Sequence, residues 1–257
     1  MGNYLFGNTG ELLESHFGAL SDLLDAGTFA RIEQLGLPES ARCLEIGGGG
    51  GSVTSWLADL VGPRGDITAT DLDVDRLAPL ERDNVTVLRH DVVRDVLPEN
   101  AYDLVHARLV LIHLPERDAV LRKLVRALRP GGRLLLDEFD CRPLHVLTAP
   151  TPEDAELIMR VKDALLTLLE QAGADVTYGA RIEKALRDNG LRDVAAVREV
   201  DEWQGGEAGC ALLAGNVLQT RGRMPLPDPD VDRFVELMGD PAVVLSGYAV
   251  CSAWGTR

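Results

Sequence analysis

Short apolar runs alternate with helical segments between residues 41 and 140, and this alternation permits few folds. The runs that are typical of strands are 41–46, 66–71, 84–91, 102–109 and 133–139. Between them, residues 52–61 and 116–128 repeat apolar side chains at helical spacing. Strands that alternate with helices form βαβ units, whose sheets are mostly parallel. The sequence therefore predicts an α/β fold.

Beyond residue 140 the pattern is less regular. One helix is predicted before the alternating region, at 9–25. Four more are predicted after it, at 152–172, 180–190, 209–222 and 231–239, with a loop at 224–230. Strands are predicted at 192–203 and 243–254, which completes seven. We expect a Rossmann-like, doubly wound, seven-stranded, mostly parallel sheet with flanking helices. Residues 1–40 would form an N-terminal lid on the substrate side, and 41–257 one domain with a helical insertion at about 143–172.

Charge and cysteine usage narrow the function classes. A net charge of −15 repels phosphate backbones, which argues against a nucleic-acid partner. No apolar run approaches the ~20 residues that span a bilayer, and the first residues lack a signal-peptide pattern. The four cysteines lie far apart without a CxxC pair, which favours a reducing cytoplasm and no structural zinc. We therefore expect a cytoplasmic protein with no membrane partner.

Five glycines, 47–51, follow the apolar run Cys43–Ile46 and open the helix at 52–61. A flexible linker would have polar flanks. Here the glycines follow a buried type of strand, and α/β sheets bind ligands at the carboxyl ends of their strands. Glycine also lets a ligand approach the backbone closely. The run is thus predicted to be a ligand-binding loop rather than a tight turn.

The spacing of the glycines discriminates between ligands. The dinucleotide pattern GxGxxG fails, because Ser52 or Val53 stands at its sixth position, and no Lys follows as in GxxxxGK[ST]. The pattern that fits is E/D-x-GxGxG, through Glu45, Gly47, Gly49 and Gly51. Over about residues 40–140 the chain resembles the small-molecule branch of the class I S-adenosylmethionine-dependent methyltransferases. The resemblance implies S-adenosyl-L-methionine as cofactor and S-adenosyl-L-homocysteine as product.

Further cofactor contacts follow from this resemblance. The glycine loop would pack against the methionine part, Asp71 would bind the ribose hydroxyls, and Asp91 with the Val92 N–H would bind the adenine. Other expected neighbours of the cofactor are Leu72, Ala107, Arg108 and, through the ammonium group, Glu45. Alternatives remain open: Asp73 in place of Asp71, turn capping by Asp71 or Asp91, and an arginine partner for Glu45.

The methyl acceptor is less constrained. An imidazole ordinarily titrates near neutrality, so His113 can take a proton from an acceptor, or it can pack against or cap the next helix. Tyr4 and Glu11 are further catalytic candidates, and Glu138 and Asp140 follow with weaker support. Strand four ends in Ala107-Arg108 rather than acidic ligands, so no metal is expected, and the [ND]PP[YF] motif of nucleic-acid methylators is absent.

The sequence thus favours methyl transfer to oxygen, nitrogen or an electron-rich aromatic carbon, such as that of an indole, of a small molecule in specialised metabolism. The alternatives are an NAD(P)-dependent oxidoreductase and a catalytically silent cofactor-binding protein of the same fold. Many small-molecule members of the family are dimers, so the resemblance leaves a homo-oligomer open.

Overall fold

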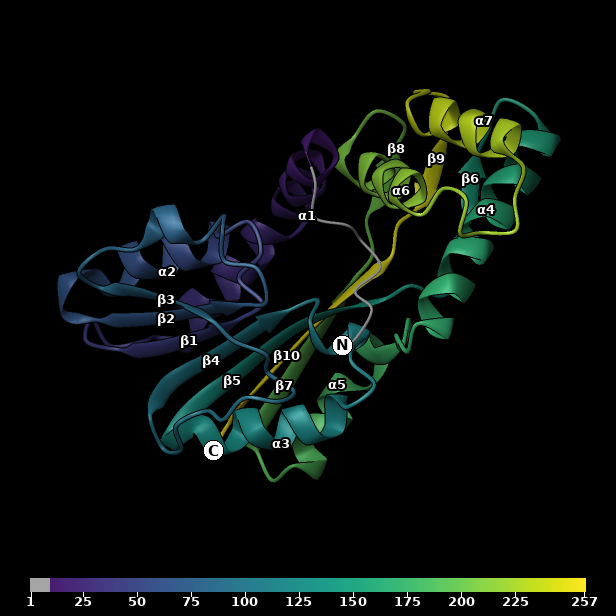
Figure 1. The fold of residues 1–257 in the computed structure, drawn as a ribbon. Coiled ribbons are helices and arrows are strands. Elements are labelled where there is room, and N and C mark those ends of the chain that lie inside the picture. The colour runs from purple at the N-terminus through teal and green to yellow at the C-terminus, as the bar shows by residue number, and fades with distance from the viewer. Residues whose placement is uncertain (1–9) are drawn as a thin grey trace.

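The computed structural model describes residues 10–257 and contains the predicted seven-stranded sheet (Figure 1). Its strands are β1 Arg42–Ile46, β2 Asp66–Asp71, β3 Val85–Arg89, β4 Tyr102–Arg108, β5 Leu128–Asp140, β7 Arg192–Glu199 and β10 Ala249–Thr256. Their order is β3-β2-β1-β4-β5-β10-β7. The first five are parallel, and β10 is antiparallel to both of its neighbours. The strand order reverses between β1 and β4, where sheets of this kind bind ligands.

Helices cover both faces of this sheet. The second half of α1 (Glu11–Leu35) and α2 (Ser52–Val61) bury Ile32 and Leu57 on one face, in a cluster that includes Ile67 of β2. On the opposite face, α3 (Arg117–Ala127) and α5 (Ile182–Asp188) pack against β4, β5 and β10. The expectation of a Rossmann-like sheet with flanking helices is confirmed.

A smaller unit, which we call the cap, lies beside one end of the sheet (Figure 1). It contains a three-stranded sheet, β6 Val146–Thr148, β9 Val244–Ser246 and β8 Glu202–Gln204, and the helices α4 Pro152–Gln171, α6 Ala208–Gln219 and α7 Asp228–Met238. Thr151 caps α4 by accepting the Asp154 N–H, and Arg233 of α7 donates two hydrogen bonds, each 3.0 Å long, to the Asp154 carboxylate. The chain contributes the cap in two separate segments.

Several predicted boundaries were wrong for identifiable reasons. The first helix does not end at residue 25 but runs through Gly27 to Leu35, because burial of Ile32 and Leu35 outweighs the low helix propensity of glycine. The predicted strands 192–203 and 243–254 are each divided between the main sheet and the cap. The second division lies at Gly247, where any Cβ would collide with the Trp203 ring. α7 begins at Asp228, inside the predicted loop.

Within residues 10–257, none of the helices combines the length and apolarity needed to cross a membrane.

A fully buried imidazole lies between two buried carboxylates inside the main sheet. His106 Nε2 is 3.4 Å from Asp137 Oδ2, and His106 Nδ1 is 3.7 Å from Glu45 Oε1. Burial alone would lower the pKa of His106, but the two carboxylates outweigh it and raise that pKa from 6.5 to about 9. Asp137 also accepts hydrogen bonds from Thr28 of α1 (2.8 Å) and from Ser252 of β10. The cation therefore neutralises part of a charge that would be costly to bury alone.

We predict that His106→Gln destabilises the protein by about 3 kcal/mol near pH 6, because it leaves two carboxylates buried without a cation. Since the folded pKa of His106 lies above its ordinary value, the charged imidazole contributes its full stabilisation below about pH 6.5. That contribution is lost as the pH rises through about 9.

Urea unfolding followed by circular dichroism at about pH 6 and about pH 10 measures the difference between the two proteins. The exposed His145→Gln is the control and should match the wild type. A stability difference that is the same at both pH values would contradict the assignment of a charged His106.

Candidate functional site

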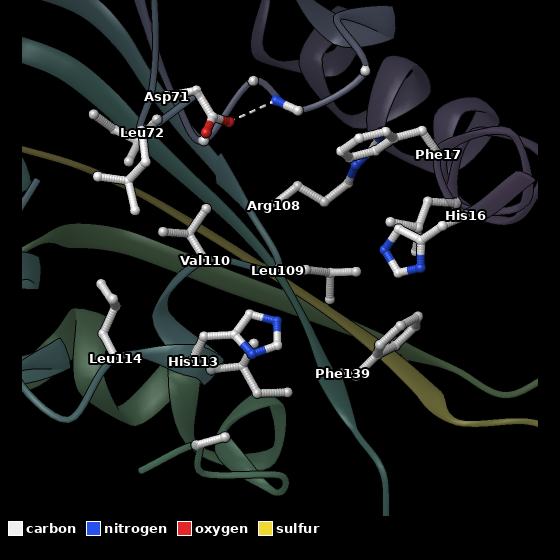
Figure 2. A pocket seen from close by; sticks show the side chains of 18 of the residues that line it. His16, Phe17, Asp71, Leu72, Arg108, Leu109, Val110, His113, Leu114 and Phe139 are labelled. Atoms are coloured by element: carbon white, nitrogen blue, oxygen red, sulfur yellow. Dashed lines mark hydrogen bonds between the residues drawn. The ribbon is translucent and has the colours of Figure 1, made fainter. Parts of the chain in front are cut away.

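A cavity of about 320 Å³ lies at the carboxyl ends of β1, β2 and β4, between the sheet, α1 and the cap. Figure 2 shows its two sides: Asp71 and Leu72 extend from β2, and His16 and Phe17 extend from α1. The predicted site residues that line it are Glu45, Gly47, Gly49, Asp71, Leu72, Asp91, Val92, Arg108 and His113. The fold therefore brings together side chains that lie up to 68 positions apart in sequence, from Glu45 to His113.

The glycine loop is held by β2. The N–H groups of Gly47 and Gly48 donate to the Thr70 carbonyl, at 2.8 and 3.0 Å, and the Gly49 N–H donates to Asp71 Oδ2 at 2.9 Å (Figure 2). Gly49 has a φ of 52°, a backbone conformation that side chains with a Cβ rarely adopt. The loop is thus a fixed turn whose backbone faces the cavity.

Phe17 of α1 and Leu77 explain why the loop also has glycine at positions 48 and 50, which the motif does not require. A Cβ at Gly50 would lie 3.0 Å from the Phe17 Cβ, and one at Gly49 would lie 2.8 Å from the Phe17 ring. A Cβ at Gly48 would meet Leu77 at 3.0 Å. The extra glycines therefore allow the first helix and Leu77 to pack closely against the loop.

Asp71 is the last residue of β2, and each of its carboxylate oxygens accepts one backbone hydrogen bond. Oδ2 accepts the Gly49 N–H, and Oδ1 accepts the Asp73 N–H at 3.2 Å. A carboxylate oxygen accepts more than one hydrogen bond, so these contacts leave acceptor capacity toward the cavity. Leu72, beside it, is 56 % exposed.

Asp91 follows β3 and organises a turn. Its Oδ1 accepts the Val93 N–H at 3.0 Å, and Oδ2 lies 3.5 Å from Arg94 Nε. The turn-capping alternative is therefore realised here, while both Asp91 and Val92 still line the cavity. Contact with an adenine ring remains a prediction.

Glu45 has a threonine and a histidine as neighbours, not the arginine that the sequence suggested as an alternative. Its side chain is buried, and Oε2 accepts the Thr54 hydroxyl at 3.1 Å while Oε1 faces His106. Because Glu45 also lines the cavity, the buried charges of the sheet extend to the edge of the site.

The two residues expected at the end of β4 have different positions. Arg108 lines the cavity, but its Nη1 pairs with Asp25 of α1 at 2.7 Å, and its Nη2 donates to Ser52 Oγ at 3.3 Å. Ala107 is fully buried in the core and is not among the cavity-lining residues. Gly51 likewise lies outside the lining, as the residue that precedes α2.

His113 ends a short 3₁₀ turn, Leu111–His113, that follows β4. Burial, reinforced by nearby His16, lowers the pKa of His113 to about 4, so its imidazole is neutral at physiological pH. Glu138 lies beneath this turn and accepts the N–H groups of Leu111 at 2.8 Å and Ile112 at 3.3 Å. Burial raises the pKa of Glu138 to about 8, although these donors oppose the shift.

The remaining catalytic candidates do not join His113 in the described structure. Glu138 and Asp140 are buried at the end of β5 and do not line the cavity. Tyr4 lies outside the described residues. Glu11 is the first residue of α1, and its side chain is also outside the described part.

Sequence reasoning missed His16 and Asn216, which line the cavity from α1 and α6. A signal for His16 was present, because it lies three residues after Leu13 and four before Leu20, on the face that was expected to be buried. Asn216 had no such signal, since its position depends on how the cap folds over the sheet.

Comparisons with known proteins agree with this geometry. Residues 44–134 match the family model described as a methyltransferase domain. The ubiquinone/menaquinone biosynthesis C-methyltransferase UbiE of Hahella chejuensis is 33% identical over 136 residues, 48% of this chain and 55% of that protein. UbiE of Ectopseudomonas mendocina is 31% identical over 137 residues, 48% of this chain and 53% of that protein. The chain thus spans about half the length of the curated relatives that it matches.

Solved structures share the fold at low sequence identity. A putative methyltransferase from an antibiotic biosynthesis pathway of Anabaena variabilis has a TM-score of 0.57 at 17% identity, over 89% of this chain and 95% of that one. Phosphoethanolamine N-methyltransferase 2 of Haemonchus contortus, solved with phosphomonomethylethanolamine and S-adenosylhomocysteine, has a TM-score of 0.54 at 16% identity, over 90% of this chain and 53% of that one. The match over residues 44–134, the glycine loop and the sheet order agree with the resemblance to class I S-adenosylmethionine-dependent methyltransferases.

Proposed function

We propose that the protein transfers a methyl group from S-adenosyl-L-methionine to a small-molecule acceptor and releases S-adenosyl-L-homocysteine. The observation that carries the proposal is one continuous cavity with two different ends. One end is formed by the glycine loop and acidic side chains at the ends of β1, β2 and β3. The other is formed by apolar side chains of α1, α4 and α6. A cofactor and an acceptor therefore have room side by side.

The charges at the loop end suit this cofactor better than a phosphate-bearing one. Glu45, Asp71, Asp73 and Asp91 line that end. The two arginines that line the cavity are each engaged by an acidic residue of α1, Arg76 by Glu14 at 2.8 Å and Arg108 by Asp25 at 2.7 Å. S-adenosylmethionine carries a sulfonium and an ammonium group, which carboxylates attract, whereas a dinucleotide needs donors or cations for its phosphates.

Each residue at this end has a distinct proposed part. Asp71 accepts the ribose hydroxyls while it holds the loop through Gly49. Asp91 and the Val92 N–H meet the adenine, with Leu72 as an apolar wall, and Glu45 faces the ammonium group. When bound, the cofactor supplies an already activated methyl group, so the chain's own task is to orient the acceptor and to exclude water.

The proposal extends to acceptors that use oxygen, nitrogen or an electron-rich aromatic carbon, in specialised metabolism. A panel of aromatic and amine metabolites, incubated with cofactor labelled in its methyl group, tests this extension by the label found in the product.

Calorimetry tests the cofactor directly. We expect S-adenosylmethionine and S-adenosylhomocysteine to bind with similar affinity, because both share the adenosine and amino-acid groups, and we expect no heat from NAD. Binding of NAD without binding of either sulfur compound would overturn the proposal and favour an oxidoreductase.

Asp71→Ala should weaken binding of S-adenosylhomocysteine by at least about tenfold, because it removes a charged acceptor of two hydroxyl groups. The matched control is Asp75→Ala, which removes the same charge four residues away from an exposed position outside the cavity lining. Both variants are compared by calorimetry, and their melting temperatures report any loss of the fold. Wild-type affinity in Asp71→Ala would remove the ribose assignment.

A further inference from the structure

Within residues 10–257, the lining of the part of the cavity away from the glycine loop includes no formally charged side chain. We call this part the acceptor end; it is lined by side chains of α1, α4 and α6, by Phe139 and Cys141 around the end of β5, and by Leu109, Val110, Ile112, His113, Leu114, Ala174, Val176 and Tyr248. Apolar side chains dominate it, among them Leu20, Leu109, Phe139, Leu165, Leu169 and Leu212. Among its described lining residues there is no Asp, Glu, Lys or Arg. An anionic or cationic acceptor would therefore lose its water without gaining an opposite charge.

Polar groups at the acceptor end are few and come from different elements. His16 lies on α1, His113 on the turn after β4, and Figure 2 shows both imidazoles on the same side of the cavity as Leu109 and Phe139. Asn216 of α6 forms a hydrogen bond with His16. Tyr248 also lines this end, and its buried hydroxyl has no hydrogen-bond partner within the described part of the chain. Such a lining can orient a hydroxyl group inside an otherwise apolar space.

The titratable groups at this end are neutral at physiological pH. Burial lowers the pKa of His16, which the hydrogen bond between His16 and Asn216 only partly opposes. Burial and the neighbouring His16 lower the pKa of His113 to about 4. Burial likewise raises the pKa of the Cys141 thiol and of the Tyr248 hydroxyl far above neutrality. A neutral imidazole offers one nitrogen that accepts a proton and one N–H that donates.

We propose that the acceptor end binds an uncharged aromatic ring that bears a hydroxyl group, and that His16 and His113 bind this hydroxyl and take its proton. This inference rests on the proposed methyl transfer and specifies its substrate class. The apolar walls fit the ring. An aliphatic amine is less suitable, because it enters from water as an ammonium ion and the described lining of this end offers it no carboxylate.

The reaction balances with these groups alone. The hydroxyl oxygen forms a bond to the methyl carbon, and the bond from that carbon to sulfur breaks with its electron pair left on sulfur. The hydroxyl proton moves to a neutral imidazole nitrogen of His113 or His16, which later releases it to water. The cofactor thereby becomes a neutral thioether, and the acceptor becomes a methyl ether.

The specificity of this end is also encoded outside the matched family region. The family model covers residues 44–134, whereas His16, Asn216 and Tyr248 lie outside it.

Three naphthalene probes test the charge preference. Calorimetry on the complex with S-adenosylhomocysteine compares 2-naphthol, 2-naphthoate and 2-naphthylmethylammonium, which share the ring but differ in charge. We expect 2-naphthol to bind at least about 30-fold more tightly than either ion, since the ions must shed water without a partner. Equal affinities, tighter binding of an ion, or no binding of 2-naphthol would overturn the inference.

A pH profile tests the role of the two histidines beyond packing. Wild-type methyl transfer to 2-naphthol should be nearly independent of pH between about 6 and 8, because the His113 imidazole stays neutral there. In the double variant His16→Gln with His113→Gln, we expect a lower rate that rises about tenfold per pH unit, as hydroxide must then remove the proton. The exposed His145→Gln serves as the control with a wild-type profile.

An unchanged, flat profile in the double variant, or no methylated naphthol with the wild type, would overturn the proton-transfer role. Melting temperatures and S-adenosylhomocysteine affinity are measured for every variant. If the wild type did not bind S-adenosylhomocysteine at all, the proposed function itself would be refuted. Failure of the substrate-class inference is therefore distinguishable from failure of the proposed function.

Discussion

One imidazolium between two carboxylates determines how the main sheet and its first helix fit together. His106 of β4 lies between Glu45 of β1 and Asp137 of β5, and Asp137 in turn accepts hydroxyl groups from α1 and β10. These contacts join four strands and a helix through groups that cannot be exposed without unfolding. Because a buried charge tolerates little displacement of its partners, the network specifies one relative position for these elements.

The position of α1 follows from this network. Thr28 fixes the second half of the helix to Asp137, and Asp25, one turn earlier, pairs with Arg108 and accepts the Ser52 hydroxyl at the start of α2. Two further turns toward the N-terminus, Phe17 contacts the glycine loop. The close packing of Phe17 against Gly49 and Gly50 is thus connected, through α1, to the hydrogen bond that Thr28 donates to Asp137 in the middle of the sheet.

The fold of the central region could be predicted from the sequence because it is encoded by local periodicity. Strands and helices between 41 and 140 repeat apolar residues in patterns that their neighbours reinforce, and the sheet order agrees with them. The cap could not be predicted in this way. Its strands are only three residues long, and β8 and β9 lie in the same apolar runs as strands of the main sheet. The separation of β9 from β10 at Gly247 depends on the Trp203 ring, which is a contact between residues distant in sequence. Likewise, Glu45 was recognisable as a carboxylate in need of a partner, but only the sheet register shows that the partner is His106.

His16 and Phe17 are consecutive residues whose rings meet edge to face, with 5.6 Å between their centroids, yet they contact different parts of one cavity. Phe17 touches the loop at the cofactor end, and His16 belongs to the acceptor end. Adjacent side chains of an α-helix cannot move independently of its backbone, so a rotation or shift of α1 that creates space at one end alters the geometry at the other. The first helix therefore links the shape of the loop end of the cavity to the shape of its apolar end.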